Sequence, residues 1–208
     1  SVADEFIETI VDMAKKIKPG QSYGPATMPS QLNVIQSHLD DAKAKGAKFL
    51  LGGPDSVKGA FVEPVIMVDV PEDSTAMTQE TFGPTLAINK VMNTDEAIKL
   101  SNASSYGLAA AVFSKREGEK IASKLACGMV SINSVFLFAA IAAVPFGGVK
   151  DSGYGRIHGA EGLLEYTYAR SVVKTRFKIP LRFTTFKRTK LSEKILTLLI
   201  KKLHGRRK

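Results

Sequence analysis

Apolar residues recur at helical spacing in the first part of the chain. They occupy positions 6, 7, 10, 11, 14 and 17, which predicts a helix that ends at Pro19-Gly20. We expect Ser1 to act as its N-cap, because a hydroxyl can accept a hydrogen bond from a free backbone amide of the first turn. A second amphipathic helix is predicted with Ser30 as its N-cap and Gly46 as its stop.

Short apolar runs separated by further helical patterns predict a sheet with crossover helices. Pro64 lies within one of these runs, and a proline in a strand favours an edge position. Strands separated by helices of about ten residues are typical of a mainly parallel sheet, so we expect an α/β fold. The predicted strands cover residues 49–51, 61–68, 85–92, 108–113 and 129–133, and the predicted helices among them cover residues 94–102, 115–125 and 159–166.

The regular pattern is lost between Ser134 and Arg156. This stretch contains the longest apolar run of the chain, the twelve residues from Val135 to Phe146, which is too short to span a bilayer. A long aperiodic segment inside a compact domain is usually functional. A further strand is predicted over Tyr168–Phe177.

The composition is that of a globular protein rather than a disordered or fibrous one. Of 208 residues, 44% are hydrophobic and 24% are charged. The single cysteine, Cys127, excludes a disulfide framework and suits a reducing compartment, and no secretory signal opens the chain. We therefore expect a cytoplasmic protein.

The basic excess is confined to one end of the chain. Residues 1–166 hold 15 Lys/Arg against 19 Asp/Glu, whereas residues 167–208 hold 14 Lys/Arg against Glu193 alone. Within this tail, the apolar residues of Leu191–Leu203 fall on one arc of about 200° at helical spacing, with lysines opposite. Such a helix fits docking on a neighbouring subunit or an absent domain, or contact with an anionic membrane surface. Nucleic-acid binding is disfavoured, because only Phe183 and Phe186 could interleave with the basic residues.

Candidate nucleophiles and metal ligands are sparse. Cys127 falls where a predicted helix turns into a buried strand, which favours a structural role over a nucleophilic one. The three histidines, His38, His158 and His204, lie in different elements and share no metal-ligand spacing with other residues. We therefore expect no metal site.

The segment Glu80–Pro84 places an acid and an aromatic ring just before a predicted strand. An acid there could accept hydrogen bonds from sugar hydroxyls, with Phe82 against a flat ring. Spacing alone favours the alternative, in which Glu80 is a surface residue and Phe82 belongs to the core.

Several motifs together resemble the NAD(P)-dependent aldehyde dehydrogenase superfamily. The resemblance covers about residues 2–177 and only the family's C-terminal half. The motifs, in the family's order, are Glu80-Thr81-Phe82-Gly83-Pro84, then Asn102 and Tyr106-Gly107-Leu108-Ala109-Ala110, Gly128-Met129-Val130 and Pro145-Phe146-Gly147-Gly148-Val149-Lys150, followed by Ser152-Gly153 and Gly155-Arg156.

The resemblance implies which residues face the cofactor and the substrate. Glu80 would hydrogen-bond the ribose of NAD or NADP, and Phe82 would pack beside the nicotinamide. The residues that would wall an aldehyde tunnel, and would make it suit a lipophilic aldehyde, are Val135, Phe136, Leu137 and Phe138.

The resemblance also implies what this chain lacks. The nucleophilic cysteine that forms a thioester, the general-base glutamate and the dinucleotide-binding domain would lie in a missing N-terminal half, so the isolated chain should be inactive. Tyr168–Phe177 matches the strand that joins subunits into a homo-oligomer. The expected organisation is a catalytic-domain-like region over residues 1–166, an oligomerisation strand over residues 167–178 and a basic amphipathic tail over residues 179–208. A stand-alone, non-enzymatic binding module is the alternative.

Overall fold

The computed structural model describes residues 2–177, 186 and 189–205. Its contacts divide the chain into two compact units, residues 1–167 and residues 168–208. The helices of the first unit are α1 (Ala3–Ala14), α2 (Pro29–Ala44), α3 (Thr75–Thr78), α4 (Thr94–Ala103), α5 (Gly118–Ala122) and α6 (Gly159–Leu164), with short 3-10 turns η1 (Pro54–Ser56) and η2 (Leu137–Ala140). Its strands are β1 (Lys48–Leu51), β2 (Val57–Lys58), β3 (Phe61–Val62), β4 (Val65–Val68), β5 (Thr85–Ile88), β6 (Tyr106–Gly107), β7 (Ala109–Val112), β8 (Met129–Ile132) and β9 (Val149–Lys150).

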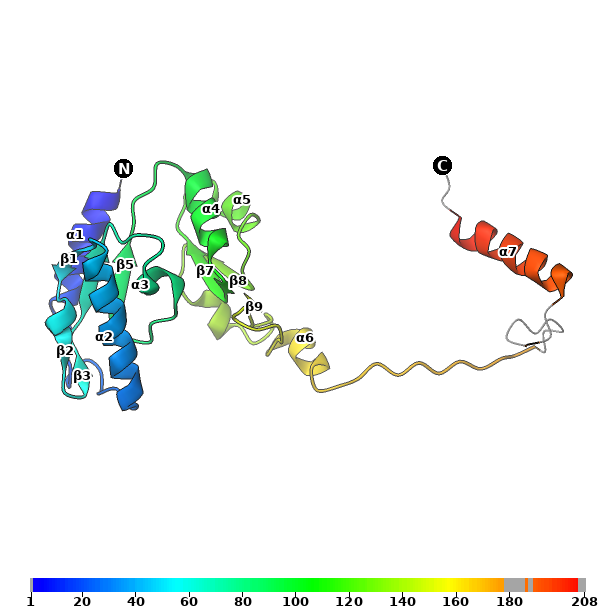
Figure 1. Cartoon of the computed structure of the whole chain (residues 1–208), viewed down its shortest axis with the longest axis horizontal. Coiled ribbons are helices and arrows are strands. Elements are labelled where there is room, and N and C mark those ends of the chain that lie inside the picture. Colours follow the sequence, from blue (N-terminus) through cyan, green and yellow to red (C-terminus); the bar gives the residue numbers. More distant parts are fainter. Residues whose placement is uncertain (1, 178–185, 187–188, 206–208) are drawn as a thin grey trace. The chain divides into compact units, whose positions relative to one another are not determined.

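The strands form small sheets in which parallel and antiparallel pairs both occur. In the three-stranded sheet β1-β4-β5, β4 is antiparallel to β1 and parallel to β5, while β7 and β8 form a second parallel pair. The pairs β2-β3 and β6-β9 are antiparallel. Each parallel pair is connected through a helix, α3 or α5, as a parallel crossover requires. Figure 1 shows α1 and α2 beside the three-stranded sheet, and α4 and α5 beside β7 and β8. The predicted α/β class is confirmed.

The predicted edge position for the strand containing Pro64 was wrong. The run breaks at Glu63–Pro64 into β3 and β4, and β4 lies in the middle of its sheet. Pro64 precedes β4, so its missing N–H costs no ladder hydrogen bond, and the first ladder donor is the amide of Val65, which donates to the carbonyl of Pro84 at 2.9 Å.

The start of α2 also differs from the prediction. The helix begins at Pro29 with Met28 in the cap position, so Ser30 lies inside the first turn and is not the N-cap. Proline suits the first helical position because its absent N–H would have no partner there. Ser1, the predicted cap of the first helix, lies outside the described residues. The predicted helix over residues 115–125 is shorter in the structure, where α5 spans only Gly118–Ala122.

The core of the first unit lies between α2 and β4. It is built from α2 residues that recur every three or four positions and from alternate residues of the strand. The buried cluster comprises Ile35, Leu39, Ala42, Ala47, Val62, Val65, Met67 and Val70. Packing on this cluster fixes α2, and α2 in turn contacts the segment that leads into β5.

The second unit contains the amphipathic helix predicted from the tail. This helix, α7 (Lys190–His204), begins with a capping box. The hydroxyls of Thr189 and Ser192 each accept a hydrogen bond from the backbone amide of the other residue. The described residues of 168–177 form no strand within the chain and are exposed. A subunit-joining strand has its partner in another chain, so Tyr168–Phe177 remains a prediction. None of the helices in the described residues is both long and apolar enough to cross a membrane.

Candidate functional site

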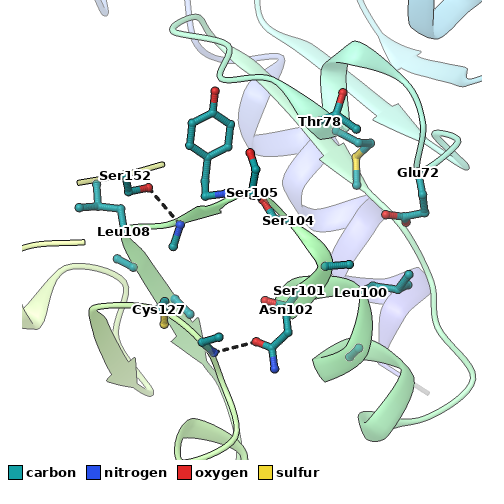
Figure 2. Close-up of a pocket in the computed structure, with 18 of the residues that line it drawn as sticks. Glu72, Thr78, Leu100, Ser101, Asn102, Ser104, Ser105, Leu108, Cys127 and Ser152 are labelled. Atoms are coloured by element: carbon teal, nitrogen blue, oxygen red, sulfur yellow. Dashed lines mark hydrogen bonds between the residues drawn. The ribbon is translucent and has the colours of Figure 1, made fainter. Parts of the chain in front are cut away.

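A cleft of about 880 Å³ lies between the segment after α3 and the strands β6 and β7. Figure 2 shows Glu72 and Thr78 on one side of it, Leu108, Cys127 and Ser152 on the other, and the end of α4 between them. Glu80 also lines the cleft. Its size falls within the range of ligand pockets, which is about 300–1,000 Å³.

Side chains of the sequence motifs hold the walls of this cleft together. Asn102, near the end of α4, donates from its side-chain nitrogen to the carbonyl of Lys124 at 2.8 Å and accepts from the amide of Ala126 at 2.7 Å. On β6, the amide of Gly107 donates to the hydroxyl of Ser152 at 3.0 Å, and Figure 2 shows this bond and the Asn102–Ala126 bond as dashed lines. Lys150 donates to two carbonyls at the end of α4, those of Asn102 and Ser104. These motif residues therefore stabilise the scaffold around the cleft.

Glu80 and Phe82 lie between α3 and β5. The Glu80 carboxylate forms no hydrogen bond or ion pair with any residue that the structure describes, and Phe82 is 70% exposed. The alternative in which Phe82 is a core residue is therefore not seen in this chain. Of the two, only Glu80 lines the cleft.

The chemistry of these two side chains fits a nicotinamide riboside. A carboxylate has only acceptor oxygens, and both are free here to accept hydrogen bonds from two ribose hydroxyls. The exposed Phe82 ring offers a flat apolar face to an aromatic ring.

The four predicted tunnel residues separate into two groups. Val135, Phe136 and Leu137 are exposed, whereas Phe138 is 8% exposed. The Phe138 ring packs against Phe136 and Phe146, with ring centroids 6.4 and 6.1 Å apart. None of these four residues lines the cleft. The structure therefore does not place them in one site with Glu80.

Cys127 lines the cleft but is not activated. Its thiol donates to the carbonyl of Met129 at 3.2 Å, and burial raises the pKa of the thiol above its ordinary value. A raised pKa leaves less thiolate at neutral pH, and the thiolate is the nucleophilic form. These observations support a structural role for Cys127.

His38 is a residue whose surroundings the sequence did not predict. It lies on α2, is 3% exposed, and contacts the side chains of Gln79 and Thr81, more than 40 positions away. The helical pattern places position 38 on the buried face of α2, but no local pattern predicts which residues it meets. Among the described residues, no three His, Cys, Asp or Glu side chains are placed to hold a metal ion.

The chain belongs to the aldehyde dehydrogenase family, whose family model matches residues 1–172. It is 40% identical over 187 residues to a protein of Mycobacterium ulcerans that carries the provisional name succinate-semialdehyde dehydrogenase, NADP(+), with 84% of this chain and 36% of that protein aligned. It is 38% identical over 182 residues to the 4,4'-diapolycopene aldehyde oxidase of a Methylomonas species, with 85% and 34% aligned.

Solved structures of aldehyde dehydrogenases are also similar to this chain. Betaine aldehyde dehydrogenase from Staphylococcus aureus in complex with NAD+ matches with a TM-score of 0.72 and 37% identity, over 79% of this chain and 35% of that one. The aldehyde dehydrogenase 21 of Physcomitrella patens, solved with the reaction product succinate, matches with a TM-score of 0.71 and 32% identity, over 79% and 35%. The chain thus spans about a third of the length of the relatives it matches.

Proposed function

We propose that the protein containing this chain oxidises an aldehyde to the carboxylic acid with NAD or NADP as hydride acceptor. The observation that carries the proposal is the Glu80 carboxylate, which lines the cleft without a hydrogen bond or ion pair among the described residues and precedes the exposed Phe82 by two positions, in a chain of the aldehyde dehydrogenase family. Glu80 would hold the cofactor's ribose, and Phe82 would limit where the nicotinamide can lie. Orientation of this kind lowers the barrier by fixing the distance and angle of hydride transfer.

Cys127, the single cysteine of the sequence, is not an activated nucleophile. The thiol of Cys127 is held as a hydrogen-bond donor to Met129, and its pKa is raised by burial. We therefore propose that the nucleophile and the general base come from another part of the protein, and that the isolated chain does not turn over aldehydes. The second possibility, a stand-alone binding module, predicts the same inactivity but no contribution of Glu80 to any cofactor site.

The substrate proposed here is a lipophilic aldehyde. Val135, Phe136 and Leu137 expose apolar side chains on an otherwise aperiodic loop, and the buried Phe138 stabilises that loop from within. An apolar wall favours an aliphatic or aromatic aldehyde over a small charged one, by about 1 kcal/mol for each buried methylene. A Phe136→Ser variant should raise the KM for a long-chain aldehyde more than that for acetaldehyde.

A single carboxylate substitution tests the cofactor contact. In the full-length protein, Glu80→Gln should raise the KM for NAD or NADP about tenfold or more, because a ribose hydroxyl loses a charged acceptor. Glu119→Gln on the exposed surface of α5 is the matched control and should leave the KM unchanged. An unchanged cofactor KM in Glu80→Gln would reject the proposed role, and turnover by the isolated chain would reject its inactivity.

We also propose that the protein is a cytoplasmic homo-oligomer that pairs strands through Tyr168–Phe177. These residues are exposed and pair with no strand in the part of the chain that the structure describes. Val172→Pro would remove one ladder donor and should lower the sedimentation coefficient of the full-length protein to that of a smaller assembly. Val2→Pro, at another exposed position, is the control, and an unchanged assembly in Val172→Pro would argue against pairing here.

A peripheral membrane contact through Leu191–Leu203 is a second proposed property, favoured by the exposed apolar side chains of α7. Leu191 and Leu203 are 67% and 72% exposed, and no residue of this helix is buried in the described structure. Residues 167–208 carry 14 Lys/Arg against one acid, which complements an anionic lipid surface. The full chain should sediment with vesicles of anionic lipid at physiological salt, and the substitution Leu198→Glu should abolish this sedimentation. Absence of sedimentation would instead favour docking of α7 on protein.

A further inference from the structure

The segment that carries Glu80 and Phe82 lies against one face of α2. Three residues of α2, each three positions from the next, contact this segment in reverse order along the chain. Asp41 accepts hydrogen bonds from the hydroxyl and amide groups at the start of α3, at Ser74 and Thr75. His38 meets Gln79 and Thr81 further along, and Ile35 meets Gly83 at the end.

His38 engages the segment with both ring nitrogens. Its Nε2 lies 3.3 Å from Oε1 of Gln79 and its Nδ1 lies 2.6 Å from the hydroxyl of Thr81. An amide oxygen only accepts, so Nε2–H donates to Gln79, and in the neutral imidazole Nδ1 then accepts from the Thr81 hydroxyl. The imidazole that forms both hydrogen bonds is nearly fully buried. Loss of either bond would leave a buried polar atom without a partner, which lowers the free energy of unfolding.

The anchored residues alternate with the displayed ones. Gln79 and Thr81 bond to His38, and Glu80 between them lines the cleft on the other side. Side chains of neighbouring residues in extended backbone point in opposite directions, and Gln79 has extended torsions of φ −122° and ψ 155°.

A tight turn follows and displays Phe82. The amide of Gly83 donates to the carbonyl of Thr81 at 3.0 Å, which places Phe82 at the centre of a three-residue turn. Gly83 itself lies so close to α2 that an added Cβ would stand 2.7 Å from Cδ1 of Ile35. The Phe82 ring, in contrast, is largely exposed.

We infer that His38 is the positioning residue of the cofactor site: its two hydrogen bonds hold Gln79 and Thr81 against α2, so that Glu80 and Phe82 are displayed toward the nicotinamide riboside. The inference rests on the proposed cofactor contact of Glu80 and Phe82. His38 itself does not touch the cofactor and acts through the backbone of this segment.

The first test uses kinetics of the full-length protein. His38→Leu should raise the KM for NAD or NADP about tenfold or more, because both hydrogen bonds of the buried imidazole are lost, while kcat and the KM for the aldehyde change less than about twofold. His38→Asn, whose Oδ1 can replace Nδ1 as the acceptor for Thr81, should recover most of the cofactor affinity. Val62→Ala, in the buried cluster against which α2 packs, is the control that lowers thermal stability without altering the cofactor KM.

Thr81→Val keeps the inference testable if His38→Leu fails to fold. It removes only the hydroxyl that donates to His38 and should raise the cofactor KM, though by less than His38→Leu does, because the bond between His38 and Gln79 remains. The double variant should be no worse than His38→Leu alone, because that substitution already removes the bond to Thr81. An unchanged cofactor KM in Thr81→Val would overturn the inference.

The second test needs no catalysis. Amide hydrogen exchange of a peptide covering residues 79–83 should be faster in His38→Leu than in the unaltered protein or in Val62→Ala. Equal exchange in all three proteins would overturn the inference.

The outcomes separate this inference from the proposed function. If Glu80→Gln raises the cofactor KM and His38→Leu does not, the positioning role is overturned and the proposed function stands. If Glu80→Gln leaves the cofactor KM unchanged, the proposed cofactor contact of Glu80 fails, and hydrogen exchange alone then decides whether His38 holds the segment.

Discussion

Gly83 lies so close to Ile35 of α2 that a methyl group on its α-carbon would stand 2.7 Å from Cδ1 and 3.0 Å from Cγ1 of that side chain. Ile35 is buried within the main core cluster and has little room to move. The chain therefore passes α2 at this point only because residue 83 has no side chain. This contact ties the segment that carries Glu80 and Phe82 to the core.

We expect Gly83→Ala to destabilise the protein by about 1–3 kcal/mol, because the methyl group must displace Ile35 or the segment itself. Urea unfolding of the purified chain measures the change. Gly24→Ala is the matched control, because an added Cβ there meets no atom within 4 Å. Equal stability of the two variants would show that the approach of Gly83 to α2 imposes no constraint.

Asn102 connects the end of α4 to the turn before β8. We expect Asn102→Ala to lower the free energy of unfolding by about 1 kcal/mol, because two hydrogen bonds to the backbone are lost. Asn102→Asp keeps the acceptor for Ala126 and loses the donor to Lys124, so its effect should be intermediate. Asn33→Ala, at an exposed position of α2, should cause no loss. A loss in Asn33→Ala equal to that in Asn102→Ala would count against the connecting role.

Asp41 should make stability depend on acidic pH. Hydrogen bonds from the hydroxyl of Ser74, and then from the amide of Thr75, lower the pKa of Asp41 to about 2. Since this pKa lies below the unfolded value near 3.8, the carboxylate stabilises the fold above about pH 4, and this contribution is lost as pH falls toward 2.

Thermal unfolding of the chain and of Asp41→Asn between pH 2 and pH 5 measures this contribution. The melting temperature of the unaltered chain should fall more steeply over this range, because the amide that replaces the carboxylate in Asp41→Asn does not titrate. Parallel curves for the two proteins would exclude a titrating role for Asp41.

Cys127 should react slowly with thiol reagents at neutral pH. Burial raises the pKa of its thiol, and the thiol also donates to the carbonyl of Met129, so little thiolate is present at pH 7. Iodoacetamide labelling of the folded chain should be several-fold slower than that of glutathione, and the rate should rise with pH. In the full-length protein, the Cys127→Ser variant should still oxidise aldehydes. Loss of aldehyde oxidation in this variant would instead indicate that the Cys127 thiol is the nucleophile.

Much of the local structure followed from short-range pattern. The apolar spacing predicted α1, α2 and α7, because one face of each helix recurs at the helical period whatever it later packs against. The helix predicted over residues 94–102 is α4, and its cap is Asn93, whose side chain accepts a hydrogen bond from the amide of Glu96. The motifs around Glu80 and Gly107 predicted the family, which the family model confirms.

Long-range contacts decided the rest. The sequence could not show that β4 occupies the middle of its sheet, because a strand's position depends on which strands pair with it. It also left Phe82 more consistent with a core residue, whereas the structure exposes its ring. Pairing of Tyr168–Phe177 depends on a second chain and stays a prediction.

The sequence by itself determined the period of each helix and strand and the residue types of the candidate site. Only the tertiary structure brought His38 to Thr81, because 43 positions separate them and no local pattern specifies such a contact. Burial of α2 against β4 places that imidazole, and the turn after Thr81 places Phe82. The exposed positions of Glu80 and Phe82 therefore depend on how α2 packs. The spacing of residues along the chain does not specify this packing.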